Sequence, residues 1–431
     1  MSSRLRHPLL ALAGVIALTI PWLLIRGLGL VPSLPVSAVI LTSGVAVIGA
    51  AFVLTWAAET AEVDVPRSFA LAVLAIIAVA PEYAVDALYA WEAGVAPGTP
   101  ASETAANLAV ANMTGANRIL VGLGWSIIAL YAIYRARTTN DEAVTRRGGF
   151  LADSVRLEPR ISIEILFLSA ATIYALFIPF LGGIDALDAI ILVGLYGGYV
   201  VIILRGETTH EPQLGVPGYL QKQPRFRRIV AVLVMFAFSG FVILIAVKPF
   251  AKGLETLGPR LGLSSFFMIQ WVAPFASESP EFIATAYLVR KLRTTSAFNA
   301  LISSKLNQWT LLIGTLVVVY SISLGHYGVL QFSQKQAGEI WLTAAQSFFA
   351  VTLLVNFEIS IREAVALLGL FAFQFLPFFQ TYDGLMLFSG LYLVLGIAIL
   401  IWRRDDIPTV FARAREHGIS RQSAAVSAEN E

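Results

Sequence analysis

The sequence predicts an all-α polytopic membrane protein, and three observations lead to that fold class. Of the 431 residues, 57% are hydrophobic and only 13% are charged, whereas about a quarter are charged in ordinary soluble domains. The mean hydropathy is +0.75, and the apolar residues gather in stretches of about 20, the length at which a helix crosses a bilayer. The main sequence landmarks also occur twice in the same order, which indicates an internal duplication.

About twelve stretches have the length and apolar character of a membrane-spanning helix, with six in each half of the chain. Polar segments separate them. In chain order the expected spans are residues 8–31, 36–57, 68–93, 104–134, 161–180, 184–204, 228–250, 262–290, 297–323, 340–357, 361–380 and 383–402.

The basic residues predict how these spans are oriented. Lys and Arg concentrate in the loops on one side of the predicted topology, above all in residues 135–160, 205–228 and 403–421. Because cytoplasmic loops carry the excess of Lys and Arg, we expect a multi-pass protein of the cell membrane with both termini in the cytoplasm. Of the 30 basic residues, only Arg118 and Lys305 fall deep inside predicted spans; the others lie in loops or within six residues of a span end.

The expected domain organisation follows from the spans. The first span could also be a cleaved signal peptide with residues 32–38 as its exit, which leaves the remaining topology unchanged. Residues 136–160 are expected as a polar loop, and the tail is expected to be disordered because it lacks apolar periodicity. The parts are an extra N-terminal helix at 1–31, repeat 1 at 36–204, a cytoplasmic linker at 205–227, repeat 2 at 228–380, an extra C-terminal helix at 383–402 and a polar cytoplasmic tail at 405–431.

Three landmarks define the duplication: a Pro-Glu pair, an Asn seven residues before a Gly, and an acid that opens an apolar helix. The first copy has Pro81-Glu82, Asn117 with Gly124, and Asp188; the second has Pro280-Glu281, Asn307 with Gly314, and Glu363. Each copy holds five spans, and an odd number reverses the orientation of the second copy. The expected architecture is therefore two inverted repeats with one extra helix at each end, as in secondary transporters.

The two Pro-Glu pairs are the first candidates for chemistry. A proline inside a membrane helix removes a backbone hydrogen bond and frees carbonyl oxygens, so Pro81 and Pro280 are each expected to mark a helix break beside a carboxylate. Free carbonyls and a carboxylate together favour a cation site, formed by Glu82 and Glu281.

Further oxygen atoms are expected near these two carboxylates. Asp86 shares a helix face with Glu82, and Glu278 shares one with Glu281. Hard cations such as Ca²⁺ and Na⁺ take oxygen ligands of this kind, whereas the scarcity of histidine argues against a transition-metal site. The following helices offer Asn107, Asn112 and Asn117 in the first copy, and Asn299, Ser303, Ser304 and Asn307 in the second.

These buried carboxylates need partners. One charge in a membrane helix costs about 2.5 to 3.5 kcal/mol, so four would cost on the order of 10 kcal/mol if left alone. The partners could be a bound cation, protons, or the two basic residues within spans, Arg118 and Lys305.

The two copies resemble the alpha repeats of the sodium/calcium exchanger family, the cation/calcium antiporters. In that family each repeat reads approximately G-T-S-x-P-E, then G-N-x-x-G-S-N. The resemblance covers spans two to eleven and implies that Glu82 and Glu281 bind Ca²⁺ or Na⁺, with Asn112, Ser277, Glu278 and Ser303 as further ligands. The residues that carry it are Pro81-Glu82, Asn112, Gly115 and Asn117 in the first copy, and Ser277, Pro280-Glu281 and Asn307 in the second.

Three departures from the family pattern affect the coupling ion. Residues 78–79, Ala-Val, replace Thr-Ser before the first Pro-Glu pair, and Glu278 stands where the family has Ser. Lys305 and Leu306 replace the Gly-Ser of the second copy. An ammonium near the carboxylates can occupy the electrostatic place of a sodium ion, so proton coupling is at least as plausible as sodium coupling.

Each of these residues also has a structural alternative. Glu82 and Glu281 could cap broken helices, and Asp86 and Glu278 could form structural salt bridges. Lys305 and Arg118 could be internal counter-charges, and Asn117 and Asn307 could join helices by hydrogen bonds.

The sequence therefore predicts a secondary active cation antiporter that exchanges Ca²⁺ or another cation for Na⁺ or H⁺ by alternating access. The cations are substrates, no cofactor is expected, and the bilayer is the expected environment. A net charge of +2 gives no support for a nucleic-acid partner. No nucleophile-base set or phosphate loop is visible, so an enzyme is not expected. Two alternatives are a transporter of another solute, such as an organic anion bound by Arg118 and Lys305, and a transport-inactive homologue.

Overall fold

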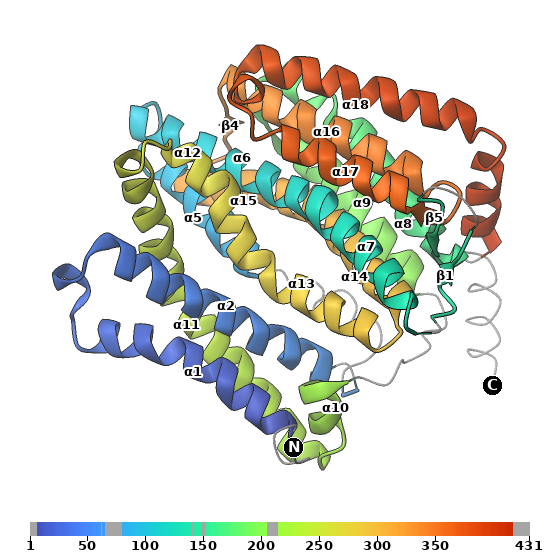
Figure 1. Ribbon diagram of the computed structural model, residues 1–431. Coiled ribbons are helices and arrows are strands. Elements are labelled where there is room, and N and C mark those ends of the chain that lie inside the picture. The colour runs from blue at the N-terminus through green and yellow to red at the C-terminus, as the bar shows by residue number, and fades with distance from the viewer. Residues whose placement is uncertain are drawn as a thin grey trace, which may run out of the picture. The chain divides into compact units, whose positions relative to one another are not determined.

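The computed structural model describes residues 7–61, 63–64, 80–139, 141–147, 151–204 and 214–416. Within these ranges the chain is almost entirely helical, with five short strands (Figure 1). Nine helices of the described residues are long and apolar enough to cross a membrane. The protein is thus an all-α polytopic membrane protein, as predicted.

Three further helices correspond to expected spans but fall short of a complete apolar crossing. α5 (Ala80–Val95) is described only from residue 80, because residues 65–79 lie outside the described ranges. α13 (Ala273–Arg290) carries Glu278, Glu281 and Arg290, and α17 (Ile361–Phe373) has 13 residues. The total of twelve spans stays a prediction.

The helices divide into two compact units, each built from both halves of the sequence. The first unit comprises residues 1–88 and 208–280, and in it α2 packs along both α1 and α11 (Figure 1). Its elements are α1 (Pro8–Gly27), η2 (Val31–Ser33), α2 (Val36–Ala61), α10 (Gly215–Gln221), α11 (Arg225–Arg260), α12 (Ser265–Phe267), the π-helix η7 (Met268–Val272) and the first parts of α5 and α13.

The second unit comprises residues 89–207 and 281–431, and in it α16 packs against α6, α8 and α18. The remaining parts of α5 and α13 belong to it. Its other helices are α6 (Pro100–Ile119), η4 (Leu120–Trp125), α7 (Ser126–Ala136), η5 (Pro159–Ile161), α8 (Ser162–Ala175), η6 (Ile178–Leu181), α9 (Ala186–Leu204), α14 (Thr294–Asn307), η8 (Gln308–Leu312), α15 (Ile313–Leu324), α16 (Gln334–Leu354), α17, η9 (Pro377–Gln380) and α18 (Tyr382–Trp402).

Two small sheets join the loops of the second unit. β1 (Val144–Thr145), β2 (Ser154–Arg156) and β5 (Glu358–Ser360) form one antiparallel sheet, in which Val155 lies opposite Ile359. β3 (Gly183–Ile184) pairs with β4 (Leu330–Gln331) in the other. Each sheet joins loops that the basic residues predict on one side of the membrane, so the pairing agrees with the predicted sidedness.

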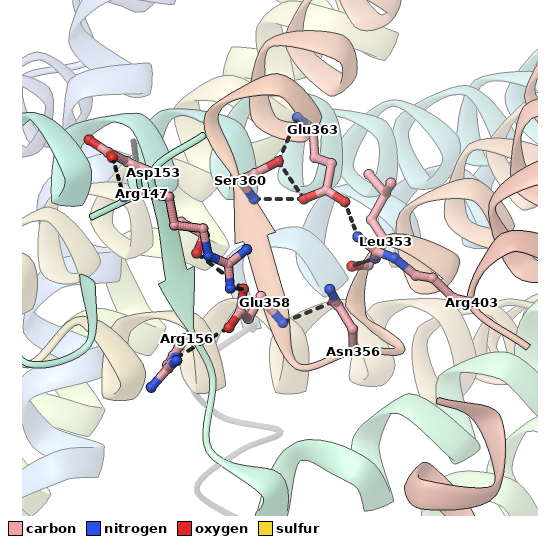
Figure 2. Close-up of polar contacts among 10 residues, drawn as sticks. Arg147, Asp153, Arg156, Leu353, Asn356, Glu358, Ser360, Glu363 and Arg403 are labelled. Atoms are coloured by element: carbon pink, nitrogen blue, oxygen red, sulfur yellow. Dashed lines mark hydrogen bonds and ion pairs between the residues drawn. The ribbon is translucent and has the colours of Figure 1, made fainter. Parts of the chain in front are cut away.

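Polar contacts strengthen the three-stranded sheet (Figure 2). Arg147 and Arg156 both form ion pairs with Glu358 on β5. Ser360 and Glu363 form a capping box at the start of α17, and Glu363 also pairs with Arg403 at the end of α18. The acid that opens this helix therefore satisfies backbone donors at a helix N-terminus, as its position predicts.

The two copies share a feature that the sequence did not predict. In each, the helix with the Asn-Gly landmark changes from α to π and back: α6–η4–α7 in the first copy and α14–η8–α15 in the second. A Cβ added at Gly124 would lie 2.8 Å from the Phe282 ring, and one at Gly314 would lie 2.7 Å from Val193. Both glycines thus allow close packing just where the helix geometry changes.

Several expectations about local structure were wrong. α13 continues through Pro280 instead of breaking there, and its irregular part is the π-helix η7 that precedes it. The linker contains α10, whose Val216 and Leu220 pack on α2. Residues 407–416 of the tail are helical, and Val410 in them is buried. In the linker and in the tail a few apolar side chains are buried against other parts of the protein, and the composition of these segments does not predict such contacts.

The pair Asp64–Arg228 connects the end of α2 to the start of α11. Two guanidinium nitrogens donate to the two carboxylate oxygens, and this arrangement holds the pKa of the Asp64 carboxyl below its usual value. Arg228 also donates to the backbone carbonyls of Gln221 and Gln223. One side chain therefore joins α2, α10 and α11.

We predict that Arg228→Gln lowers the free energy of unfolding by about 1 kcal/mol at pH 7. Because a carboxyl with a lowered pKa stabilises the fold only while ionised, the difference should disappear as the pH falls through the pKa of Asp64. The measurement is the thermal unfolding midpoint of the purified protein against pH. Arg225→Gln is the control, since Arg225 is 77% exposed and 3.7 Å from Asp64. Equal midpoints for Arg228→Gln and wild type at pH 7 would contradict the prediction.

Candidate functional site

Four of the predicted site residues belong to the first unit. Glu82 and Asp86 lie one turn apart on α5, and Ser277 and Glu278 are neighbours on α13. All four are buried, with exposed fractions of 4%, 0%, 5% and 0%. Ser277 donates to the backbone carbonyl of Pro274. The first unit thus holds three buried carboxylates, which are oxygen ligands of the kind that hard cations take.

Glu281 lies in the second unit, where its carboxylate accepts a hydrogen bond of 3.0 Å from Ser304 on α14. Ser303, the hydroxyl predicted as a ligand, lies 3.3 Å from the Tyr199 hydroxyl on α9, and its role as a ligand stays a prediction. Adjacent residues of a helix point about 100° apart, so the sequence could not decide which of the two serines faces α13. The structure assigns Ser304 to Glu281.

Lys305 is fully buried and joins α14 to α6. Its Nζ donates to Asn117 Oδ1 at 2.7 Å and lies 4.3 Å from the centre of the Trp309 ring. The Asn117 amide nitrogen donates to the Met113 carbonyl, which turns the oxygen toward the ammonium. The landmark asparagine of the first copy therefore contacts the unusual lysine of the second, and cation–π attraction adds to the contact.

The other predicted asparagines lie on the same two helices. Asn307 donates to the Tyr196 hydroxyl on α9 at 3.0 Å, which is a helix-joining hydrogen bond. Asn112 is buried on α6, with 1% exposed. α6 begins at Pro100, the first position after the N-cap Thr99, and this sequence signal places the start of the helix.

Arg118 forms an ion pair of 2.5 Å with Glu339 on α16, and both side chains are fully buried. Glu339 was absent from the predicted site because the expected span began at residue 340, one residue after it. α16 in fact begins at Gln334. A buried arginine needs an acidic partner, and this was the one indication that the sequence offered. The sequence alone could not show which acid is that partner.

Within the described ranges, no group of three or more His, Cys, Asp or Glu side chains could hold a metal ion by itself.

Buried carboxylates, amides and hydroxyls inside membrane helices are typical of pathways for small ions, and irregular helices are typical of secondary transporters. The family model described as "Sodium/calcium exchanger protein" matches residues 35–205 and 231–380 of this chain. The chain belongs to this family, whose members are transporters and not enzymes. The predicted resemblance is thereby confirmed.

Two solved structures are similar to this chain. The H⁺/Ca²⁺ exchanger CAX is 40% identical, with a TM-score of 0.86, and the match covers 96% of this chain and 98% of that one. Native YfkE is 14% identical, with a TM-score of 0.55 and coverages of 89% and 99%, which shows the shared fold alone. No curated protein matches the chain.

The Lys305–Asn117 contact predicts a stability change. Asn117→Leu removes an acceptor from a buried ammonium and should lower the free energy of unfolding by about 1.5 to 3 kcal/mol. The double variant Asn117→Leu/Lys305→Met should regain most of that loss, because it buries no charge. Thermal unfolding midpoints in one detergent provide the measurement.

Asn107→Leu is the matched control for this prediction, since Asn107 is half-buried on the same helix and accepts one backbone hydrogen bond from Ser333. Its loss should be smaller than that of Asn117→Leu. A double variant no more stable than Asn117→Leu would show that the ammonium does not depend on this amide.

Proposed function

We propose that the protein is a secondary active antiporter that exchanges Ca²⁺ for protons across the cell membrane, with both termini in the cytoplasm. The observation that carries this proposal is the match over nearly the whole chain to a structure named as an H⁺/Ca²⁺ exchanger. The buried ammonium of Lys305 on α14 supports it, because a fixed positive charge can take the place of a coupling sodium ion.

In the proposed mechanism Glu82 and Glu281 are the carboxylates that hold the cation. Asn112, Ser277 and Glu278 contribute further oxygens. When the cation leaves, protons take its place on the carboxylates, because several buried negative charges cannot remain without compensation. Each transport cycle then moves a cation in one direction and protons in the other. The inverted repeats provide two alternating orientations of the same site.

The contacts of the two buried basic residues disfavour the organic-anion alternative. Arg118 is engaged by Glu339, and Lys305 by Asn117. An anionic substrate bound by them would have to displace these contacts. In the proposed function Arg118 is instead a counter-charge, and Lys305 contributes to coupling.

The first test is Ca²⁺ flux in proteoliposomes that contain the purified protein, under either a proton or a Na⁺ gradient. We expect the proton gradient to drive flux, and Glu281→Gln to reduce it at least 100-fold, because the amide cannot supply the negative charge. Glu255→Gln is the control, since Glu255 pairs with Lys252 near the end of α11 and should keep the wild-type rate. Flux driven by Na⁺ alone would reject proton coupling, and no flux under either gradient would reject the antiporter.

A second test concerns Lys305. Replacement by Ala removes the buried charge, so we expect the pH dependence or the choice of driving ion to change. The measurement is the initial rate of Ca²⁺ flux between pH 6 and pH 9 under each gradient. If both dependences match wild type, Lys305 has no part in coupling and serves only to join α6 and α14.

A further inference from the structure

Arg118 makes several hydrogen bonds in the second unit besides its ion pair with Glu339. Its three side-chain nitrogens donate to three acceptors: Nη2 to Glu339 at 2.5 Å, Nη1 to Gln374 Oε1 at 3.4 Å, and Nε to the Thr114 carbonyl at 3.4 Å. Glu339 lies on α16, and Gln374 directly follows α17. One guanidinium thus connects α6 to two other helices.

Two glutamines close these contacts into a ring. Gln374 Nε2 donates to Gln346 Oε1 at 2.9 Å, and Gln346 Nε2 donates to the backbone carbonyl of Arg118 at 3.2 Å. Gln374 also donates to the Tyr392 hydroxyl on α18. All of these side chains are buried, with at most 1% exposed. The ring therefore holds both the side chain and the main chain of Arg118, two residues before the π-helix η4 begins.

The ring has little value as a simple source of stability. An ion pair removed from water loses most of its Coulomb energy to desolvation, and an apolar pair of similar volume is often as stable or more so. Apolar contacts, however, allow a helix to slide and rotate. A planar guanidinium with several fixed acceptors permits one orientation. The ring is therefore suited to fixing α6 about its own axis.

The residues on α6 that this orientation controls are those of the candidate site. Asn117 precedes Arg118 and accepts the hydrogen bond from Lys305, and Asn112 lies less than two turns earlier. We propose that Arg118, held by Glu339, Gln346 and Gln374, is a positioning residue that orients α6 so that its asparagines are set for cation binding. This inference rests on the proposed function, because Asn112 is a ligand only in that proposal.

The decisive variant is Arg118→Lys. A lysine can keep the charge opposite Glu339, but its single nitrogen cannot also reach Gln374, so the ring opens while the ion pair remains. We expect the KM for Ca²⁺ flux to rise at least fivefold, with the maximal rate per folded protein within twofold of wild type. A purely structural role would lower the melting temperature or the yield and leave KM unchanged.

The double variant Arg118→Met/Glu339→Met provides a second test should Arg118→Lys fold poorly. It contains neither the ring nor a buried charge, so it is expected to fold and to show the same rise in KM. Ser389→Ala is the control: this buried hydroxyl on α18 donates only to the Leu385 carbonyl of its own helix, so the KM should match wild type.

A wild-type KM in either folded variant overturns the positioning role. Absence of flux in the wild type would instead reject the proposed function. In that case hydrogen exchange tests the effect of the ring on α6, because this measurement does not depend on transport. Hydrogen exchange should become faster in Arg118→Lys both at residues 108–119 and at residues 301–309, which Lys305 joins to α6. Unchanged exchange at residues 301–309 overturns the inference, whether or not the protein transports Ca²⁺.

Discussion

A charge buried in a membrane helix must be compensated, and this requirement organises much of the second unit. Arg118 and Lys305 are the two fully buried basic side chains of the described residues, and each is engaged by a polar group from another helix. Arg118 connects α6 to α16 and to the end of α17, where Gln374 in turn contacts Tyr392 on α18, whereas Lys305 connects α14 to α6. The helices that carry candidate ligands are therefore positioned by directional contacts, because apolar packing in lipid has little orientational preference.

The two basic residues differ in how closely they are held. Arg118 has a carboxylate at 2.5 Å and a closed ring of amides, so its charge is fixed and balanced within the second unit. Lys305 donates to a neutral amide oxygen and lies against an aromatic face, and both contacts stabilise an ammonium. In the proposals made above the two residues have separate roles: Arg118 maintains geometry, and Lys305 contributes a positive charge to the candidate site. An exchanger needs both, since cation binding depends on distances and coupling depends on charge.

The irregular helices have a similar explanation. The chain changes from α to π at Leu120–Trp125, Met268–Val272 and Gln308–Leu312. These turns lie close to Asn117, Glu278 and Asn307. Such turns shift backbone donors by one residue and often occur at functional sites. Pro280 indicated irregularity in the correct segment but at the wrong position, because α13 continues through the proline and the π-helix η7 precedes it. The residues before Ala80 lie outside the described ranges, so the break expected at Pro81 stays a prediction.

By itself the sequence determined the fold class, the family and the position of most helices, because hydrophobic length and a repeated order of landmarks are local properties of the chain. It also identified Arg118 and Lys305 as buried charges. Only the tertiary structure decided their partners, since Glu339, Gln346 and Gln374 lie more than 220 residues from Arg118 along the chain. It likewise assigned Ser304 to Glu281 and Ser303 to Tyr199. The rotation of a helix about its axis depends on its neighbours, and spacing along one sequence does not contain that information.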